Sequence, residues 1–258
     1  LKKGFRVVGV EANPDHCRGV DDRLGSYVRS GHLRVVNTAI GPSAGEIAFY
    51  LNDFQPEWAT IHRQRAEYYM QFGGSVRTIK VPATRFEDLL STYGVPYYVK
   101  IDIEGADNLC VEGLASCAAR PKFVSLETSK TSFGEVFDVL SQLSALGYRR
   151  FKVVPQQWMR FWRCPNPARE GTFVDHQFPA ASSGPFGREL PGRWLDLEAT
   201  VRRYLRVFRL YRTFGDESAL HRLAPWSQRA RVKLCGWHDL HAMHVGERAG
   251  PGEPAAPA

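Results

Sequence analysis

Long apolar runs and paired cysteines are missing from this sequence. None of its 258 residues lie in a stretch approaching the ~18 consecutive apolar residues of a membrane-spanning helix. The first residues also lack the charged and apolar regions of a secretory leader. The five cysteines are odd in number, widely spaced and without a Cys-x-x-Cys pair, which argues against a disulfide framework. These absences predict a cytoplasmic protein with free thiols.

The excess of positive charge belongs to one segment. The net charge is +7, and residues 200–235 carry nine Lys/Arg and two acidic residues, so the remainder is neutral. Within this segment, arginines and apolar residues alternate at helical spacing over residues 201–212. We expect an amphipathic helix that packs on the domain with its Arg side in water. Contact of residues 201–212 with a membrane surface is the alternative, and we do not expect nucleic acid as a partner.

Apolar periodicity predicts alternating strands and helices over the first 155 residues. Buried runs that predict strands are followed by segments with helical periodicity and capping residues. Alternation of this kind predicts an α/β fold with a Rossmann-like, doubly wound, mostly parallel sheet, whose ligands bind at the carboxyl ends of the strands. The strands are expected at 5–11, 33–38, 97–104, 122–128 and 148–154, and the helices at 14–30, 84–94, 106–116, 132–147 and 198–214.

An insertion interrupts this alternation. Short strands are expected at 47–51 and 77–81, and between them residues 52–75 are rich in aromatic side chains, including Trp58. Long loops that carry aromatic residues are often functional. We therefore expect a lid that binds the acceptor substrate, with Trp58 in contact with it. The alternative is a packed excursion on the surface.

The alternation weakens after residue 155. The histidines of residues 238–244 (HDLHAMH) recur every three positions, a spacing that would suit metal ligands on a helix, but a solvated polar stretch is expected instead. Residues 246–258 are rich in Gly, Pro and Ala. We divide the chain into a domain at 1–155, a C-terminal extension at 156–245 with the basic helix, and a disordered tail at 246–258.

Acidic side chains end three of the predicted strands. Glu11 ends the first, where a carboxylate can accept hydrogen bonds from ribose hydroxyls, although an exposed acid would occupy the same position. On strand 97–104, Asp102 and Glu104 share a side with Lys100, which predicts either a functional pair or an internal salt bridge. Glu127 ends the next strand and either binds substrate or stabilises a helix N-terminus.

Several runs of residues, in order, carry a family resemblance. Residues 98–107 (YVKIDIEGAD) resemble the signature of FkbM-family methyltransferases, and residues 7–14 (VVGVEANP) resemble that family's second strand. Further matches lie at 36–41, 123–127 and 146–148. The resemblance implies the class I methyltransferase fold, S-adenosyl-L-methionine as the cofactor, and commonly the O-methylation of a hydroxyl on a small molecule or saccharide.

The resemblance also implies roles for individual residues. Glu11, with Ala12 and Asn13, would hold the cofactor ribose. Three residues at the end of the next strand would lie near the adenine, and Asp102 would face the methionine end or the acceptor. From their positions and chemistry rather than from the resemblance, Asp102 and after it Glu104 are candidates to remove the hydroxyl proton, and Glu127 and Trp58 are candidate contacts of the substrate. A divalent cation on the two acids is an alternative that we do not favour. The residues near the adenine would be Asn37, Thr38 and Ala39.

The family begins with a strand and a D-x-G-x-N-x-G-like loop, and neither precedes Leu1. We therefore expect this chain to be truncated at its N-terminus and, as it stands, to bind the cofactor poorly. Two other functions stay open. One is an NAD-dependent Rossmann oxidoreductase, a class of enzyme that also has an acidic residue at the position of Glu11, at the end of its second strand. The other is a non-catalytic protein that binds through its basic C-terminal segment. The sequence does not predict an oligomeric state.

Overall fold

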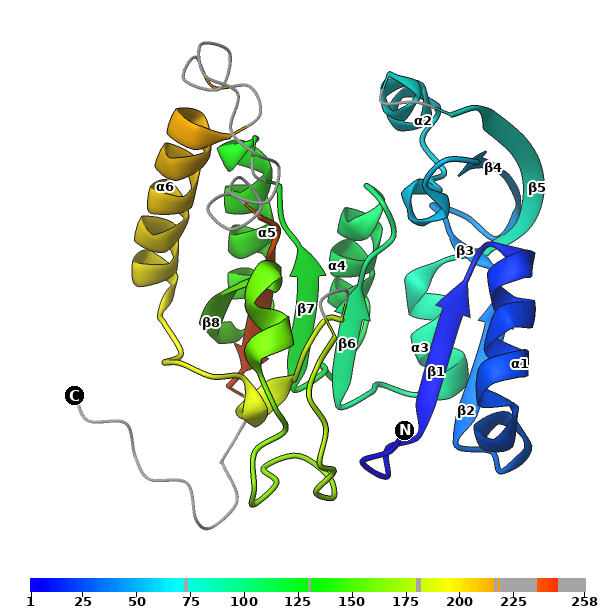
Figure 1. The fold of residues 1–258 in the computed structure, drawn as a ribbon. Coiled ribbons are helices and arrows are strands. Elements are labelled where there is room, and N and C mark those ends of the chain that lie inside the picture. Colours follow the sequence, from blue (N-terminus) through cyan, green and yellow to red (C-terminus); the bar gives the residue numbers. More distant parts are fainter. Residues whose placement is uncertain (72–73, 130, 180–181, 216–217, 219–235, 246–258) are drawn as a thin grey trace. The chain divides into compact units, whose positions relative to one another are not determined.

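A computed structural model describes the chain except residues 72–73, 130, 180–181, 216–217, 219–235 and 246–258 (Figure 1). The predicted disordered tail lies outside the described residues. The chain divides into two compact units, and each is described by itself. The first unit comprises Leu1–Val95, Ile101–Ala119 and Arg163–His176, and the second comprises Pro96–Lys100, Arg120–Trp162 and Gln177–Ala258.

The first unit begins with a β-α-β element. Strand β1 (Val7–Glu11) pairs in parallel with β2 (Leu33–Asn37), and helix α1 (Pro14–Arg29) connects them. Asn13 caps α1, because its side chain accepts a hydrogen bond from the backbone N of Asp15 at 3.0 Å. The predicted strands and helix are confirmed here, within about two residues at each end.

A three-stranded sheet follows in the first unit. In it β5 pairs in parallel with β3 and antiparallel with β4, and the strands surround a small apolar core of Ala39, Phe49, Leu51 and Val81. The insertion between β4 and β5 contains helical structure that the sequence did not predict. The elements are β3 (Ala39–Ile40), β4 (Gly45–Asn52), the 3₁₀ helix η1 (Pro56–Trp58), α2 (Arg63–Met70) and β5 (Val76–Thr84).

Two further helices complete the first unit, α3 (Phe86–Tyr93) and α4 (Asp107–Ala115). Both were predicted, but the expected start of the first one, at residue 84, is wrong. Strand β5 continues to Thr84, and Arg85 is the N-cap without any side-chain capping bond. Thr84 therefore pairs in β5 instead of capping α3 as its local sequence pattern had predicted.

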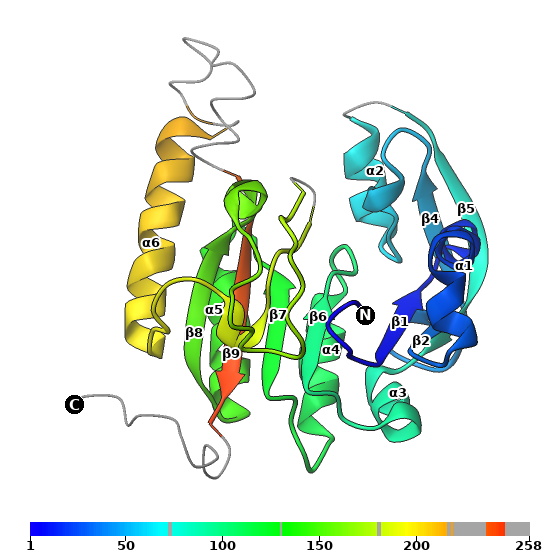
Figure 2. The ribbon, with the colours of Figure 1, turned by 60° about the horizontal axis from the view of Figure 1, so that its bottom comes forward.

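The second unit contains a four-stranded sheet with the order β6-β7-β9-β8. Its strands are β6 (Tyr98–Ile101), β7 (Phe123–Glu127), β8 (Tyr148–Pro155) and β9 (His238–His244). The last residue of β6 is counted with the first unit. Strand β9 lies between β7 and β8 and is antiparallel to both (Figure 2). The α/β class is confirmed, but the described strands form mixed sheets rather than one doubly wound parallel sheet.

Strand β9 corrects the prediction for residues 238–244. A solvated polar stretch was expected, yet Leu240 and Ala242 are fully buried, and Asp239 and His241 are only 3% and 2% exposed. The predicted C-terminal extension therefore contributes a strand to the same sheet as β7 and β8. A domain boundary at residue 155 stays a prediction.

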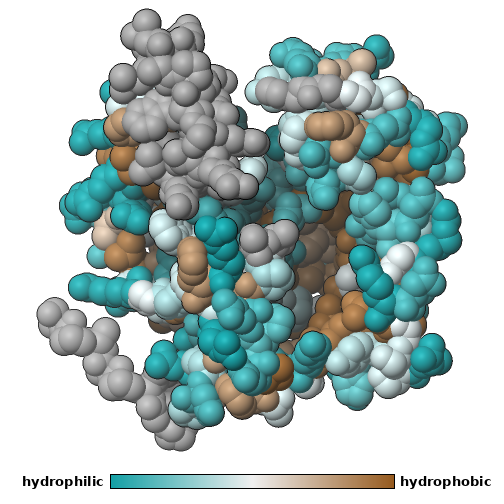
Figure 3. All heavy atoms as spheres, in the orientation of Figure 1, coloured by the Kyte–Doolittle hydropathy of each residue, from teal (hydrophilic) through white to brown (hydrophobic). Residues whose placement is uncertain are grey.

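Helices α5 (Phe133–Ala145) and α6 (Leu197–Phe214) also belong to the second unit. The side chain of Ser132 caps α5 as predicted, accepting from the backbone N of Glu135 at 3.3 Å. Helix α6 buries Thr200 and Tyr204 and exposes its arginines, and hydrophilic side chains follow its outer edge in Figure 3. The predicted amphipathic helix is confirmed. None of the helices in the described ranges combines the length and apolar character needed to cross a membrane.

The Tyr204 hydroxyl connects α6 to the sheet. The Thr128 hydroxyl donates to the carbonyl oxygen of His238 at 3.0 Å, so Tyr204 Oη donates to Thr128 Oγ1 at 3.1 Å. We expect Tyr204→Phe to lower the free energy of unfolding by about 1 kcal/mol, because the buried Thr128 oxygen loses its donor. Urea unfolding would measure this, with Tyr93→Phe, on exposed Tyr93, as the control. Equal stability of the two variants would contradict it.

Candidate functional site

Residues 102–105, which lie within the stretch that resembles the family signature, form a tight turn in the first unit. Strand β6 ends at Ile101, so the prediction that Lys100, Asp102 and Glu104 share one side of a continuous strand is wrong. Within the described residues, Glu104 alone among non-glycine residues has a positive φ, of 50°. Such a conformation persists when the surroundings hold the residue firmly.

The insertion holds this turn from one side. The carboxylate oxygen Oε2 of Glu104 accepts hydrogen bonds from the Tyr69 hydroxyl at 2.9 Å and from Arg65 Nη2 at 3.2 Å. The Thr60 hydroxyl donates to the backbone oxygen of Glu104 at 2.7 Å. The ring of Trp58 stacks on that of Tyr69, with centroids 4.8 Å apart. Glu104 and Trp58, both predicted site residues, are therefore brought into one cluster.

Asp107 holds the turn from the other side. Its Oδ1 accepts from the backbone N of Ile103 at 3.3 Å, and its Oδ2 accepts from the backbone N of Gly105 at 3.1 Å. These bonds satisfy amide groups that would otherwise lack partners in a turn. Between these two sets of contacts, Asp102 stays exposed.

Burial and the charge of Asp102 act on the pKa values of the other two acids of the turn. Burial raises the pKa of Glu104, hydrogen bonds from Tyr69 and Arg65 oppose this rise, and the Asp102 charge adds to it. Burial also raises the pKa of Asp107, opposed by the backbone amides that bond to it. Burial and the Asp102 charge thus both favour the neutral forms of Glu104 and Asp107, and the Arg65 guanidinium opposes this effect at Glu104.

The residues after β1 and β2 form a second candidate region of the first unit. Glu11 and Asn37 are partners in the parallel ladder. Asn37 Nδ2 donates to the backbone oxygens of Glu11 at 2.8 Å and Ala12 at 3.1 Å, so its amide fixes the shape of this loop. Glu11 Oε1 accepts from the backbone N of Asn13 at 2.7 Å, while His16 Nδ1 lies 3.6 Å from Oε2. The Glu11 side chain is 35% exposed.

Thr38 and Ala39 turn their side chains away from solvent. The Thr38 hydroxyl donates to the backbone oxygen of Pro82 at 3.1 Å, and Ala39 packs in the apolar core against Phe49 and Leu51. The backbone N of Thr38 donates to Glu11 O at 3.1 Å. Any contact of these two residues with a ligand would therefore come from the shape and backbone of the loop.

Glu127 lies in the second unit, at the end of β7, where it is exposed and opposite Asp239 of β9. Asp102 belongs to the first unit. A shared position of Glu127 and Asp102 at one site therefore stays a prediction.

The second unit buries polar side chains that sequence reasoning missed. Ser125, His241 and Lys152 are lateral neighbours on β7, β9 and β8. Lys100 Nζ lies 3.3 Å from Asp239 Oδ2, so the salt bridge that was an alternative for Lys100 does form, with a partner on β9. The alternation of Leu240 and Ala242 with polar residues was the signal that could have revealed this strand.

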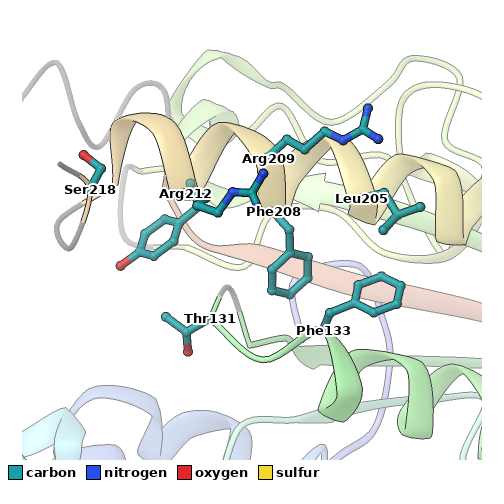
Figure 4. Close-up of a pocket in the computed structure, with 8 residues that line it drawn as sticks. Thr131, Phe133, Leu205, Phe208, Arg209, Arg212 and Ser218 are labelled. Carbon is teal, nitrogen blue, oxygen red and sulfur yellow. The ribbon is translucent and has the colours of Figure 1, made fainter. Parts of the chain in front are cut away.

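A pocket of about 550 Å³ also lies in the second unit, between the start of α5 and the end of α6 (Figure 4). Phe133 and Phe208 meet there edge to face, with ring centroids 5.5 Å apart. Arg209 and Arg212 contribute to its lining, but none of the predicted site residues does. Among the residues that the structure describes, no group of three or more His, Cys, Asp or Glu could hold a metal ion.

Comparison with known proteins identifies the first 150 residues. The family model described as the Methyltransferase FkbM domain matches residues 1–150, which include both candidate regions of the first unit, strand β7 and the start of β8. No curated protein and no solved structure matches the chain. Because the matched region covers more than half of the sequence, the chain belongs to the FkbM methyltransferase family.

Proposed function

We propose that this protein transfers the methyl group of S-adenosyl-L-methionine to a hydroxyl oxygen of a small molecule or saccharide. The observation that carries the proposal is the loop after β1. There the Glu11 carboxylate stands at the carboxyl end of a parallel strand, and Asn37 of the neighbouring strand fixes the backbone around it. Nucleotides bind at such strand ends in α/β proteins.

The groups in this loop fit a ribose. One carboxylate oxygen of Glu11 is occupied by the backbone N of Asn13, and the other faces His16 at a distance too long for a hydrogen bond. That second oxygen can accept from a ribose hydroxyl. The backbone groups of Ala12 and Asn13 would border the same sugar, and the loop at Thr38 and Ala39 would border the adenine.

The bound sulfonium would supply a methyl carbon that is already activated for displacement. The protein must then orient the acceptor oxygen in line with it and accept the hydroxyl proton. Asp102 suits the second task because it is the exposed carboxylate of the turn that follows β6. Glu104 is the second candidate for the base, and Trp58 and Glu127 are proposed contacts of the acceptor.

Calorimetry with S-adenosylhomocysteine tests the proposal, on protein expressed from its whole coding sequence. We expect binding of S-adenosylhomocysteine and none of NAD. Glu11→Gln should weaken the binding about tenfold, because the amide keeps the bond to Asn13 but loses the charged acceptor for the ribose. The control Glu46→Gln changes an exposed acid on β4 and should leave the affinity unchanged.

Other outcomes would point elsewhere. Binding of NAD without S-adenosylhomocysteine would replace the proposal with an oxidoreductase. Binding of neither, together with salt-sensitive binding of anionic lipid or nucleic acid, would favour a non-catalytic protein that uses its basic segment. Equal affinity of Glu11→Gln and Glu46→Gln would remove Glu11 from the cofactor site.

A further inference from the structure

We propose that Arg65 and Tyr69 are positioning residues for methyl transfer. Through the carboxylate of Glu104 they hold the turn of residues 102–105, and thereby fix where Asp102 presents its own carboxylate. This inference rests on the proposed function, since it assigns the insertion to the same site. It also separates the two acids of the turn, with Asp102 facing the ligand and Glu104 serving as the attachment point for α2.

The hydrogen bonds among these groups form a closed triangle. Arg65 Nε donates to the Tyr69 oxygen at 2.8 Å, so the single hydroxyl proton of Tyr69 is directed to Glu104 Oε2, 2.9 Å away. Arg65 Nη2 reaches the same carboxylate oxygen at 3.2 Å. Each bond in such a chain polarises the next, and bonds to ionised groups are stronger than neutral ones. Loss of any one of the three residues therefore removes two of the bonds and weakens the third.

The helix packs directly on the turn. The Glu104 side chain is only 19% exposed. Gly105 has a φ of 98°, and a Cβ at this position would lie 3.0 Å from both Cδ and Nη1 of Arg65. Glycine is favoured here by its backbone conformation, and the absence of a Cβ lets Arg65 approach closely. A side chain on Gly105 would require Arg65 to shift by a few tenths of an ångström.

The same contacts explain why Glu104 keeps an uncommon backbone conformation. Thr60 binds its carbonyl, Tyr69 and Arg65 bind its carboxylate, and Asp107 binds the amides on either side. A residue in the left-handed region costs about 1 kcal/mol or more, so it needs several such contacts to persist. When the contacts from α2 are lost, the turn can relax and Asp102 with it.

Two substitutions remove the contacts from α2 with little change in shape. Tyr69→Phe deletes one hydroxyl and keeps the ring that stacks on Trp58, whereas Arg65→Met deletes the guanidinium and keeps an unbranched apolar chain. Two residues of the same helix provide matched controls. Tyr68→Phe deletes a hydroxyl from a ring that is 48% exposed, and Arg63→Met deletes a guanidinium paired with Glu67 at the surface.

Hydrogen–deuterium exchange of the ligand-free protein is the first measurement. We expect faster exchange of the Ile103 and Gly105 amides in Tyr69→Phe and Arg65→Met, and wild-type rates in the two controls. The second measurement is the affinity for S-adenosylhomocysteine. It should fall about tenfold in Tyr69→Phe and in Arg65→Met, which are called the clamp variants because Arg65 and Tyr69 clamp the carboxylate of Glu104, and stay unchanged in the controls. Arg65→Lys should recover part of the affinity, because it keeps the charge but not the forked geometry.

The pH dependence of that affinity adds a readout that a purely structural role would not change. The groups facing Glu104 are Arg65 and Tyr69 from α2 and Asp102 from the turn itself. Tyr69→Phe removes a hydrogen bond that lowers the pKa of Glu104, so that pKa rises further. The acidic limb of the affinity profile should therefore move to higher pH in Tyr69→Phe and stay in place in Tyr68→Phe.

The outcomes separate this inference from the proposed function. If the wild-type protein binds no S-adenosylhomocysteine, the proposed function fails and the positioning role fails with it. If the wild-type protein binds and the clamp variants match their controls in exchange, affinity and pH profile, the positioning role alone is overturned. Faster exchange without any loss of affinity would also overturn it, since the turn would then be held for stability only.

Discussion

Replacing Asp102 with Asn is expected to slow methyl transfer about 10²- to 10⁴-fold, the usual contribution of a positioned general base. The substitution keeps the size and polarity of an exposed side chain in the turn after β6 but cannot take up a proton. The variant keeps Arg65, Tyr69 and Glu104, so the hydrogen bonds that these three residues make to hold the turn are retained.

The measurement is the transfer of labelled methyl from S-adenosyl-L-methionine to a hydroxyl acceptor that the wild-type protein methylates. Glu104→Gln provides the comparison, since it should reduce both the affinity for S-adenosylhomocysteine and the transfer rate by loosening the turn. Asp102→Asn should instead lower kcat far more than affinity. A transfer rate for Asp102→Asn within threefold of the wild type would exclude it as the base.

His241 is expected to make the protein less stable as the pH falls below neutral. It is 2% exposed, and burial together with Lys100 and Lys152 lowers its pKa from 6.5 to about 3. The unfolded chain takes up a proton near pH 6.5 that the folded chain cannot accept until about pH 3. Stability is therefore unaffected above pH 7 and falls as pH decreases, by about 2 kcal/mol from this one group between pH 7 and pH 5.

Substitution His241→Leu should remove this dependence. Among the described residues no group hydrogen-bonds to His241 Nε2, so an apolar side chain leaves no broken bond at that atom. Urea unfolding at pH 7 and pH 5 would show a smaller loss of stability in His241→Leu than in the wild type. His32→Gln, on an exposed histidine before β2, is the control and should keep the wild-type loss. The same loss in both variants would contradict the assignment.

The sequence predicted the elements of the first unit well where periodicity and local capping agree. Asn13 and Pro14 marked the start of α1, and Ser132 marked the start of α5 in the second unit, and both starts are confirmed by a backbone N–H that donates to the side chain of Asn13 or Ser132. Strand β9 was missed because its register depends on β7 and β8, which lie far away in the sequence. Two of its histidines, His238 and His241, are buried by those partners, although a solvated stretch was expected.

Site prediction from the sequence shows the same limit. The family resemblance placed Glu11 and Asn37 near the same cofactor, and the structure makes them partners at the ends of two parallel strands. The clamp on Glu104 could not be predicted, because Arg65 and Tyr69 lie on a helix with almost no apolar signal, and their role comes from one contact across the fold. Polar residues that act through tertiary hydrogen bonds leave no periodic pattern in a sequence.

The antiparallel position of β9 has a consequence for biosynthesis. A ribosome delivers β7 and β8 early, yet the strand that separates them emerges only when His238–His244 have been made. Until then β7 and β8 have no shared partner, and each exposes an unpaired edge on the nascent chain. Folding of this sheet can therefore be completed only after His238–His244 have been synthesised, and a chain that stopped directly after β8 would keep those edges open.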